Sequence, residues 1–396
     1  MKYCGYCNTP LHDNEIVCSF CGREQQLMIP PHHLLPGTVL NGKYLIGQAL
    51  GEGGFGITYV GTDTKLELKV AIKEYYPSGF ANRSNTISAE ISCGMGGERT
   101  EFFEKGRMRF LDEAKTLAKF SGFRGIVNVR DFFEENNTAY IVMEYLEGKT
   151  LKEYLQQQGT LPIHTTLNLL MPAMESLNQV HKYGLIHRDI SPDNIMLVGN
   201  SVKLLDFGAA RSAANAGNKS LSIMLKHGYA PEEQYRSRGI QGPWTDVYAL
   251  CATIYKCITG ITPDDATERV YKDELKRPSQ LGVKINPTME MALMKGLAVF
   301  KKDRWQNIEE LLQGLRSGAK EIPKQTANRP IPQSRPAENK VMVQPKPVVR
   351  QSSVQEKPKR RGLSPVAIVF IIIGAAFVTM DMLGAILILL ISLSGN

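Results

Sequence analysis

Six short strings occur in a single order along this chain, and that order constrains the fold more than any other feature of the sequence. They are GEGGFG (51–56), VAIK (70–73), FLDEAK (110–115), HRDISPDN (187–194), DFG (206–208) and TDVYAL (245–250). The glycine pattern of the first string is weak evidence alone, since turns and dinucleotide-binding folds use it too. Six in register are not expected by chance, so they indicate one fold and one site.

The chemistry of the strings is that of phosphoryl transfer from ATP. They supply a phosphate cover, a cation with an acid to orient it, a base and two metal ligands. From residue 37 to about 317 the chain resembles a eukaryotic-type (bacterial Hanks-type) serine/threonine protein kinase. The resemblance implies an α+β, two-lobed protein-kinase fold, with an N-lobe at about 37–145 and a C-lobe at about 146–317.

The periodicity of the sequence agrees with two lobes. Short apolar runs surround the Gly-rich string, whereas helical spacing dominates the second half of the chain. We expect strands at 44–46, 58–60, 69–72 and 140–143, and helices at 110–120, 167–181 and 246–258. Strands followed by helices are typical of an α+β protein.

The net charge of +8 at pH 7 raises the question of nucleic acid binding. Much of that excess lies in residues 340–361, which contain seven Lys or Arg and one acid. Because an apolar segment follows directly, this cluster favours anionic membrane lipid as a partner, and no nucleic acid is expected.

The nucleotide would be bound by the Gly-rich hairpin and an apolar pocket. By resemblance, backbone amides of the hairpin approach the phosphates, while Met143 helps to line the adenine pocket and Glu144 to Leu146 form the hinge. The expected ATP-binding residues are Leu50, Gly51, Gly53, Gly54, Phe55, Gly56, Thr58, Ala71, Lys73, Glu144 and Leu146. A hairpin with a purely structural role is the alternative.

The resemblance also assigns the charged groups. Lys73 contacts the α- and β-phosphates and is held by a salt bridge to Glu113. These residues lie 40 positions apart (73 to 113), about twice the family's usual separation, so roughly 75–105 is interpreted as an insertion. Asp189 matches the catalytic-loop base. Asn194 and Asp206 match the ligands of Mg²⁺ (or Mn²⁺), which prefers hard oxygen donors.

Other positions match structural or regulatory parts of the family. Asp246 is expected to hold the catalytic loop by its backbone, and Glu233 to pair with Arg304 beneath the activation segment. Arg188 precedes the base, which is typical of kinases whose activation segment is pinned by a phosphate. The candidate phosphate acceptors are Ser220 and Ser222, for which an unmodified loop is the alternative reading.

Two positions depart from the family pattern. Ser191 stands where a Lys is usual, two residues after the base, and Lys226 stands where a Thr is usual, seven residues before Glu233. We hypothesise that the two side chains have been exchanged, so that Lys226 supplies the cation and Ser191 the hydroxyl. If Glu232 were the motif's Glu, the Thr position would be Leu225 and the hypothesis would fail. An exposed Lys226 in a slow or inactive enzyme is the other interpretation.

Four cysteines fall within the first 21 residues, in two Cys-x-x-Cys pairs. Cys4, Cys7, Cys18 and Cys21 predict four thiolates around a structural Zn²⁺, in a unit that resembles a zinc ribbon over residues 1–24. A redox dithiol is the alternative. His12 and the pair His32–His33 are not needed as ligands of this site, and residues 25–36 are expected to be a linker.

The C-terminal part of the chain changes composition twice. Residues 318–364 are rich in Pro, Gln and Lys and predict a disordered linker. Residues 365–393 are almost wholly apolar and exceed the roughly 20 residues that cross a bilayer, so they predict a single transmembrane helix. Basic residues precede it, which places the kinase region on the cytoplasmic side as a tail-anchored protein. Asp381 suggests pairing in the membrane, hence a possible homodimer.

Three functions compete on these grounds. The first is a membrane-anchored kinase that transfers the γ-phosphate of ATP to Ser or Thr hydroxyls of cytoplasmic proteins and autophosphorylates. The second is a pseudokinase scaffold that binds nucleotide and signals through partners, which Ser191 favours. The third, a zinc-ribbon binder of nucleic acid, is disfavoured by the small size of that unit.

Overall fold

The computed structural model describes residues 2–319 apart from 13–14, 26–27, 94–95, 208–224 and 237. Its N-terminal lobe is built on an antiparallel six-stranded sheet, ordered β3-β4-β5-β6-β10-β9. The strands are β3 (Val39–Leu40), β4 (Tyr44–Gly53), β5 (Gly56–Asp63), β6 (Leu68–Tyr75), β9 (Val129–Glu135) and β10 (Thr138–Glu144). The four predicted strands coincide with β4, β5, β6 and β10, each of which extends further than its apolar run.

Strand β6 shows how the sheet separates core from cleft. Side chains alternate between the two faces of a strand, so Val70, Ile72 and Glu74 share the buried face. Ala71 and Lys73 consequently lie on the other face, toward the cleft. The strand therefore presents the candidate phosphate-binding lysine at the site while it anchors itself in the core.

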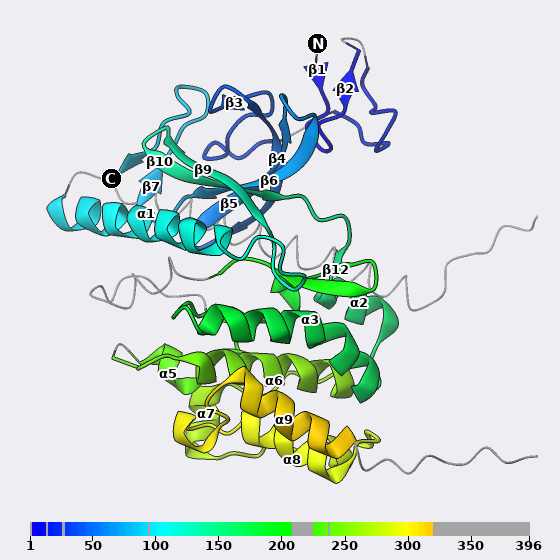
Figure 1. The fold of residues 1–396 in the computed structure, drawn as a ribbon. Coiled ribbons are helices and arrows are strands. Elements are labelled where there is room, and N and C mark those ends of the chain that lie inside the picture. The colour runs from blue at the N-terminus through cyan, green and yellow to red at the C-terminus, as the bar shows by residue number, and fades with distance from the viewer. Residues whose placement is uncertain are drawn as a thin grey trace, which may run out of the picture. The chain divides into compact units, whose positions relative to one another are not determined.

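Helix α1 (Gly97–Ala118) crosses the lobe and is drawn in cyan in Figure 1. Its buried stripe includes Phe103, Phe110, Ala114 and Leu117, which recur at helical spacing. The predicted helix at 110–120 is correct in type, but α1 begins 13 residues earlier (97 against 110). Residues 97–105, the last part of the segment interpreted as an insertion, therefore belong to this helix.

The remainder of the insertion folds back on the sheet. It contains the hairpin of β7 (Ala81–Asn82) and β8 (Ser92–Cys93). Part of the segment expected to be a linker at 25–36 contacts this region: Arg83 Nη1 donates to the His32 carbonyl, and Leu34 is 2% exposed. The described residues around His32 to Leu34 and around Arg83 are thus part of the folded N-lobe.

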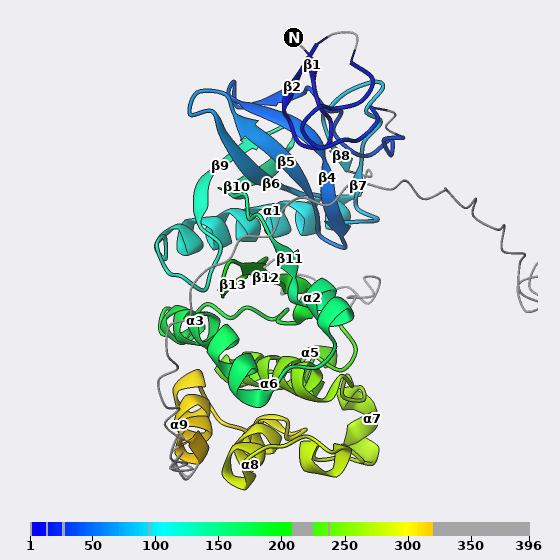
Figure 2. The same ribbon diagram turned by 90° about the vertical axis from the view of Figure 1, so that its right-hand side faces the viewer.

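The Cys-rich unit contains a small hairpin of β1 (Lys2–Tyr3) and β2 (Pro10–Leu11). One Cys-x-x-Cys turn lies between these strands, at Cys4–Cys7, and the other follows them, at Cys18–Cys21. The unit lies beside β4 in both Figure 1 and Figure 2. Asn8 Nδ2 donates to the Leu45 carbonyl over 2.9 Å, and the Gln48 amide donates to the Gly5 carbonyl over 2.5 Å. The unit is therefore docked by one side-chain and one backbone hydrogen bond on the strand that leads into the Gly-rich hairpin.

The C-terminal lobe is mainly helical, around the almost fully buried helix α6 (Pro243–Thr259). Pro243 starts α6 at its first position and Gly260 ends it with φ 76°, which is the usual asymmetry of helix ends. The other elements are β11 (Lys149–Thr150), α2 (Leu151–Gln158), α3 (Ile163–His181), η1 (Pro192–Asn194), β12 (Ile195–Val198), β13 (Ser201–Leu204), α5 (Glu232–Tyr235), α7 (Ala266–Tyr271), η2 (Pro278–Leu281), α8 (Pro287–Gly296), η3 (Lys301–Asp303) and α9 (Ile308–Ala319). The helices predicted at 167–181 and 246–258 coincide with α3 and α6.

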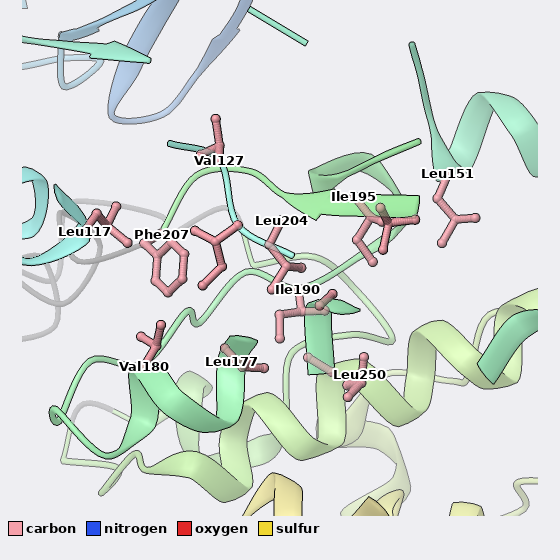
Figure 3. Close-up of a cluster of buried hydrophobic side chains, with 14 of the residues drawn as sticks. Leu117, Val127, Leu151, Leu177, Val180, Ile190, Ile195, Leu204, Phe207 and Leu250 are labelled. Atoms are coloured by element: carbon pink, nitrogen blue, oxygen red, sulfur yellow. The ribbon is translucent and has the colours of Figure 1, made fainter. Parts of the chain in front are cut away.

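A buried apolar cluster supports the loops between the lobes. Figure 3 shows Ile190 from the HRD loop and Leu204 from β13 in one cluster with Leu177 of α3 and Leu250 of α6. Phe207, next to the DFG aspartate, belongs to the same cluster and is 2% exposed. The polar residues beside Ile190 and Phe207 are therefore held in place by a well-packed apolar cluster.

Candidate functional site

The Gly-rich hairpin is formed by the end of β4 and the start of β5, where Gly53 pairs with Gly56. A Cβ at Gly51, Gly53 or Gly54 would meet nothing within 4 Å, so these positions leave open space for a ligand. A Cβ at Gly56 would lie 2.5 Å from the Glu74 carbonyl oxygen. The fourth glycine is thus required by strand packing, a role that its motif does not reveal.

The HRD loop is held from below by Asp246. This carboxylate accepts hydrogen bonds from the His187 amide (2.7 Å), the Arg188 amide (2.8 Å) and His181 Nε2 (2.8 Å). Burial alone would raise the pKa of Asp246, but the hydrogen bond from His181, the charges of His181 and His187 and the amide hydrogen bond of Arg188 together outweigh it and leave that pKa below its usual value. The structure thus places Asp246 where the sequence expects a scaffold residue.

Two backbone positions beside the site are unusual. Arg188 has φ 66° and Asp206 has φ 47°, the left-handed region that non-glycine residues seldom adopt. Arg188 is more strained there than Asp206, because Asp tolerates this region better. Such conformations persist only where surrounding contacts impose them, and for Arg188 one such contact is the hydrogen bond of its amide to Asp246.

Asp189, Asn194, Asp206 and Lys73 line one cavity of about 270 Å³ together with the Gly-rich hairpin. Asn194 Nδ2 donates to Asp189 Oδ2 over 2.6 Å and to the Asp189 carbonyl over 2.8 Å. Lys73 Nζ lies 2.9 Å from Asp206 Oδ1. The side-chain oxygens of Asn194 and Asp206 thus open on the same space, and this donor set fits Mg²⁺.

The partner expected for Lys73 was Glu113. Glu113 lies on α1 and is buried at 5% exposure, while the ion pair of Lys73 in this structure is with Asp206. Arg188 is also near Glu113: burial lowers the pKa of Arg188, and the charges of Asp246 and Glu113 act against that shift. The Lys73–Glu113 bridge stays a prediction.

The side chain of Lys226 lies close to Asp189, the candidate catalytic base. Its Nζ donates to Ser191 Oγ over 2.8 Å and lies 4.0 Å from Asp189 Oδ1 and 3.8 Å from Asp193 Oδ2. Ser191 is fully buried. The structure therefore brings the two unusual residues together beside Asp189, although they are 35 positions apart in sequence.

The register that assigns Lys226 depends on Glu233. Arg304 donates from Nη1 to Glu233 Oε1 over 2.8 Å and from Nη2 to Oε2 over 3.0 Å, a bidentate and buried pair. Glu232 pairs instead with Arg236. The structure thus places Glu233, and not Glu232, against Arg304, which is the register that puts Lys226 at the usual Thr position.

A second cavity, of about 400 Å³, adjoins the first and shares Gly51, Thr58, Asn194 and Asp206 with it. Its lining contains the expected adenine-site residues Leu50, Ala71, Met143, Glu144 and Leu146. The Glu144 amide donates to the Asn128 carbonyl over 3.0 Å, so this amide is already engaged within the sheet.

Sequence reasoning missed several residues of this cleft, among them the following. Val127, Met196 and Leu205 supply apolar lining to the second cavity, and Asp193 lies between Lys226 and Lys152. A signal existed for two of them, since Leu205 directly precedes Asp206 and Met196 follows Asn194 by two positions. Val127 enters from a distant loop and has no such signal.

The four cysteines of the Cys-rich unit lie at the spacing of a metal site. Cys4 Sγ lies 3.7 Å from Cys21 Sγ, Cys7 Sγ lies 3.7 Å from Cys18 Sγ, and all four sulfurs lie within 4.8 Å of one another. Sulfurs of a tetrahedral zinc site with bonds of roughly 2.3 Å are about 3.8 Å apart. Burial raises the pKa of Cys7 to about 12, and its neighbouring thiols contribute. The donor set therefore fits Zn²⁺, whose charge would favour four thiolates.

Some predictions fall outside the described residues. Ser220 and Ser222 lie in 208–224, and both the expected linker from 320 onward and the expected transmembrane helix at 365–393 also lie beyond them. No helix within the part of the chain that the structure describes is long and apolar enough to span a bilayer.

Comparison with known proteins agrees with the geometry. A family model described as "Protein kinase domain" matches residues 44–325. Serine/threonine-protein kinase PknA of Nostoc sp. is 28% identical over 296 residues, which cover 72% of this chain and 49% of that protein. Serine/threonine-protein kinase PknL of Mycobacterium tuberculosis is 31% identical over 243 residues, which cover 60% of this chain and 55% of that protein.

A solved chain described as "PpkA-294 apo form" is 36% identical, with a TM-score of 0.62, and the match covers 72% of this chain and 99% of that one. The curated relatives are longer: the match spans 38% of a probable serine/threonine-protein kinase of Clostridium perfringens. In general this chain covers about half or less of the length of these curated proteins.

Proposed function

This chain belongs to the protein kinase family, and from that premise we propose that it is an ATP-dependent serine/threonine protein kinase. The reaction moves the γ-phosphoryl group of ATP to a Ser or Thr hydroxyl of a protein, including its own chain. One observation carries the proposal: Lys73, Asp189, Asn194, Asp206 and Lys226 line a single cavity beneath the Gly-rich hairpin.

Each residue has a definite task in that reaction. Asp189 accepts or orients the proton of the attacking hydroxyl, and its hydrogen bond from Asn194 Nδ2 fixes the direction of its carboxylate. Lys73 contacts the α- and β-phosphates. Asn194 and Asp206 would hold Mg²⁺ or Mn²⁺, which neutralises charge on the β- and γ-phosphates when bound. The hinge contributes the Glu144 carbonyl and the Leu146 amide to the adenine.

The exchanged pair completes the site. Lys226 Nζ, 4.0 Å from Asp189 Oδ1, brings a cation to the position where the γ-phosphate meets the base. Ser191 Oγ accepts the hydrogen bond of that ammonium and keeps it from moving away. We therefore assign to Lys226 the role that a lysine two residues after the base has in most relatives, and to Ser191 that of the tying hydroxyl.

The competing function is a nucleotide-binding pseudokinase, which the serine at 191 favours. Incubation of residues 1–325, the compact unit that contains the site, with Mg-ATP separates the two. Asp189→Asn is the matched control because it keeps the size of the side chain. We expect phosphate on Ser or Thr of the wild type, and a loss of roughly 10²–10⁴-fold in the variant. Equal incorporation in both proteins, or none in either, would favour the scaffold.

Two further parts of the proposal concern the ends of the chain. The four cysteines bind a structural Zn²⁺, and the unit they form contacts protein rather than nucleic acid. Residues 365–393 anchor the chain in the cell membrane with the kinase domain in the cytoplasm, the basic cluster at 340–361 contacts anionic lipid, and Asp381 allows the helix to pair with a second copy. Fractionation of the full chain beside a chain ending at 325 tests the anchor, since only the full chain should sediment with membranes.

A further inference from the structure

His32, His33 and Glu52 form a second group of metal-ligand side chains, separate from the Cys cluster. His32 Nε2 lies 3.0 Å from Glu52 Oε1, and His33 Nε2 lies 3.0 Å from Glu52 Oε2. The three donor groups lie within 4.8 Å of one another. Glu52 belongs to the Gly-rich hairpin, between Gly51 and Gly53, whereas the two histidines precede the kinase sheet.

The backbone that carries the histidines is held by the insertion. Arg83 Nη1 donates to the His32 carbonyl over 2.9 Å, and Asn85 Nδ2 donates to the His33 carbonyl over 3.1 Å. The Asn85 amide donates to the Pro31 carbonyl over 2.8 Å. The two imidazoles are therefore presented from a rigid support, which lowers the entropic cost of binding a ligand.

The donor set has a clear chemical preference. Two imidazoles and one carboxylate suit Zn²⁺ and related first-row ions, whereas Mg²⁺ and Ca²⁺ prefer oxygen alone. Ligand atoms at roughly 2.0–2.1 Å from a tetrahedral Zn²⁺ are about 3.3 Å apart, close to the 3.0 Å of both His–Glu contacts. The side chains of His32 and Glu52 are 33% and 37% exposed, so an ion and a fourth, water ligand can reach them.

We propose that His32, His33 and Glu52 bind a divalent transition-metal ion, with zinc as the natural candidate. The ion joins the Gly-rich hairpin to the segment before the sheet. The insertion holds the same hairpin from its tip, because the Tyr76 amide donates to the Phe55 carbonyl over 3.1 Å and the Ser78 amide to the Gly54 carbonyl over 3.0 Å. With the metal bound, the hairpin is fastened both at its tip and at Glu52.

A consequence for nucleotide exchange rests on the proposed kinase function. A fastened hairpin opens less often, so ATP and ADP should exchange more slowly when the site is filled. The metal site itself does not depend on that function, and its test uses no nucleotide. Failure of the kinase proposal and failure of this one are therefore distinguishable.

The test is the zinc content of the full chain after equilibrium dialysis against buffered Zn²⁺. The wild type is expected to hold one zinc ion in the Cys cluster and a second at His32, His33 and Glu52. His32→Ala/His33→Ala and, separately, Glu52→Gln should each lose one of the two. His164→Ala, which removes an exposed histidine from α3, is the matched control and should keep both.

Cobalt substitution identifies which site is lost. Co²⁺ at the Cys cluster gives sulfur-to-metal charge-transfer bands, whereas Co²⁺ bound by nitrogen and oxygen gives only visible ligand-field bands. The Glu52→Gln protein should keep the sulfur-to-metal charge-transfer bands and lose the ligand-field bands of the nitrogen- and oxygen-bound Co²⁺. The retained charge-transfer bands would show that the protein is folded. A wild type with a single zinc ion, or a second zinc that survives both sets of substitutions, overturns the proposal.

Discussion

Glu74 and Arg83 form an ion pair whose two side chains are both fully buried. Arg83 donates to both carboxylate oxygens, with Nη1 3.0 Å from Oε2. Tyr59 and Tyr140 donate to the same carboxylate through their hydroxyls, at 3.1 and 2.7 Å. Because Glu74 follows Lys73 on β6, this network connects the inserted segment to the strand that carries the phosphate-binding lysine.

Removal of one partner should be costly. Arg83→Met leaves the Glu74 carboxylate buried without its cation, which destabilises proteins by about 3–5 kcal/mol. We expect the midpoint of urea unfolding to fall accordingly. Lys115→Met, which removes an exposed partner of Asp112, is the control and should leave the midpoint unchanged. Equal midpoints for Arg83→Met and wild type would show that water enters the network.

The exchanged pair predicts a reciprocal rescue. Lys226→Met should lower kcat by roughly 10²–10³-fold, because a cation aimed at transition-state charge is lost. Ser191→Lys combined with Lys226→Thr restores the usual arrangement of the family and should recover much of that activity. Steady-state kinetics of phosphate transfer to a protein substrate measure both, with Lys65→Met on the exposed β5–β6 turn as the control. A double variant no faster than Lys226→Met would contradict the exchange.

Loss of the zinc ion from the Cys cluster should weaken the hydrogen bonds that the Cys-rich unit makes to β4. Cys7→Ser is expected to remove the zinc of the Cys cluster and to loosen the unit, since so small a unit depends on its metal for folding. Leu45 and Gln48 would then lose their hydrogen bonds to Asn8 and Gly5. Hydrogen exchange of the Gln48 amide should become faster in Cys7→Ser and stay slow in Cys93→Ser, whose cysteine lies outside the cluster. Unchanged exchange in both would mean that β4 does not need the unit.

Acid should weaken the support of the HRD loop. The pKa of Asp246 is lower in the folded protein than its ordinary value: burial opposes the shift, but the hydrogen bonds from His181 and the Arg188 amide and the charges of His181 and His187 together exceed its effect. Its contribution to stability is therefore present at neutral pH and is lost as the pH falls through that lowered pKa. Asp246→Asn should be less stable at pH 7 and lose less further stability between pH 5 and 3. Parallel stability curves for the two proteins would exclude this carboxylate as the cause.

Much of the fold was readable from periodicity. The strands around the Gly-rich turn and the helices α3 and α6 have strong apolar patterns, so local sequence was sufficient for their type and approximate place. Helix α1 was recognised only from residue 110, although it begins at Gly97. Its first turns are polar and Gly-containing, and their helical state depends on packing of Phe103 against Tyr75, whose ring centroids are 5.1 Å apart.

The sequence by itself determined the chemistry of the site, because each motif carries its own base, metal ligands or cation at a fixed place in the chain. Only the tertiary structure decided which distant residues meet. It set Lys226 beside Ser191, placed Glu233 rather than Glu232 against Arg304, and brought His32 and His33 to Glu52. No local pattern encodes such contacts, since they depend on how separately formed segments pack, and packing is decided by burial over the whole lobe.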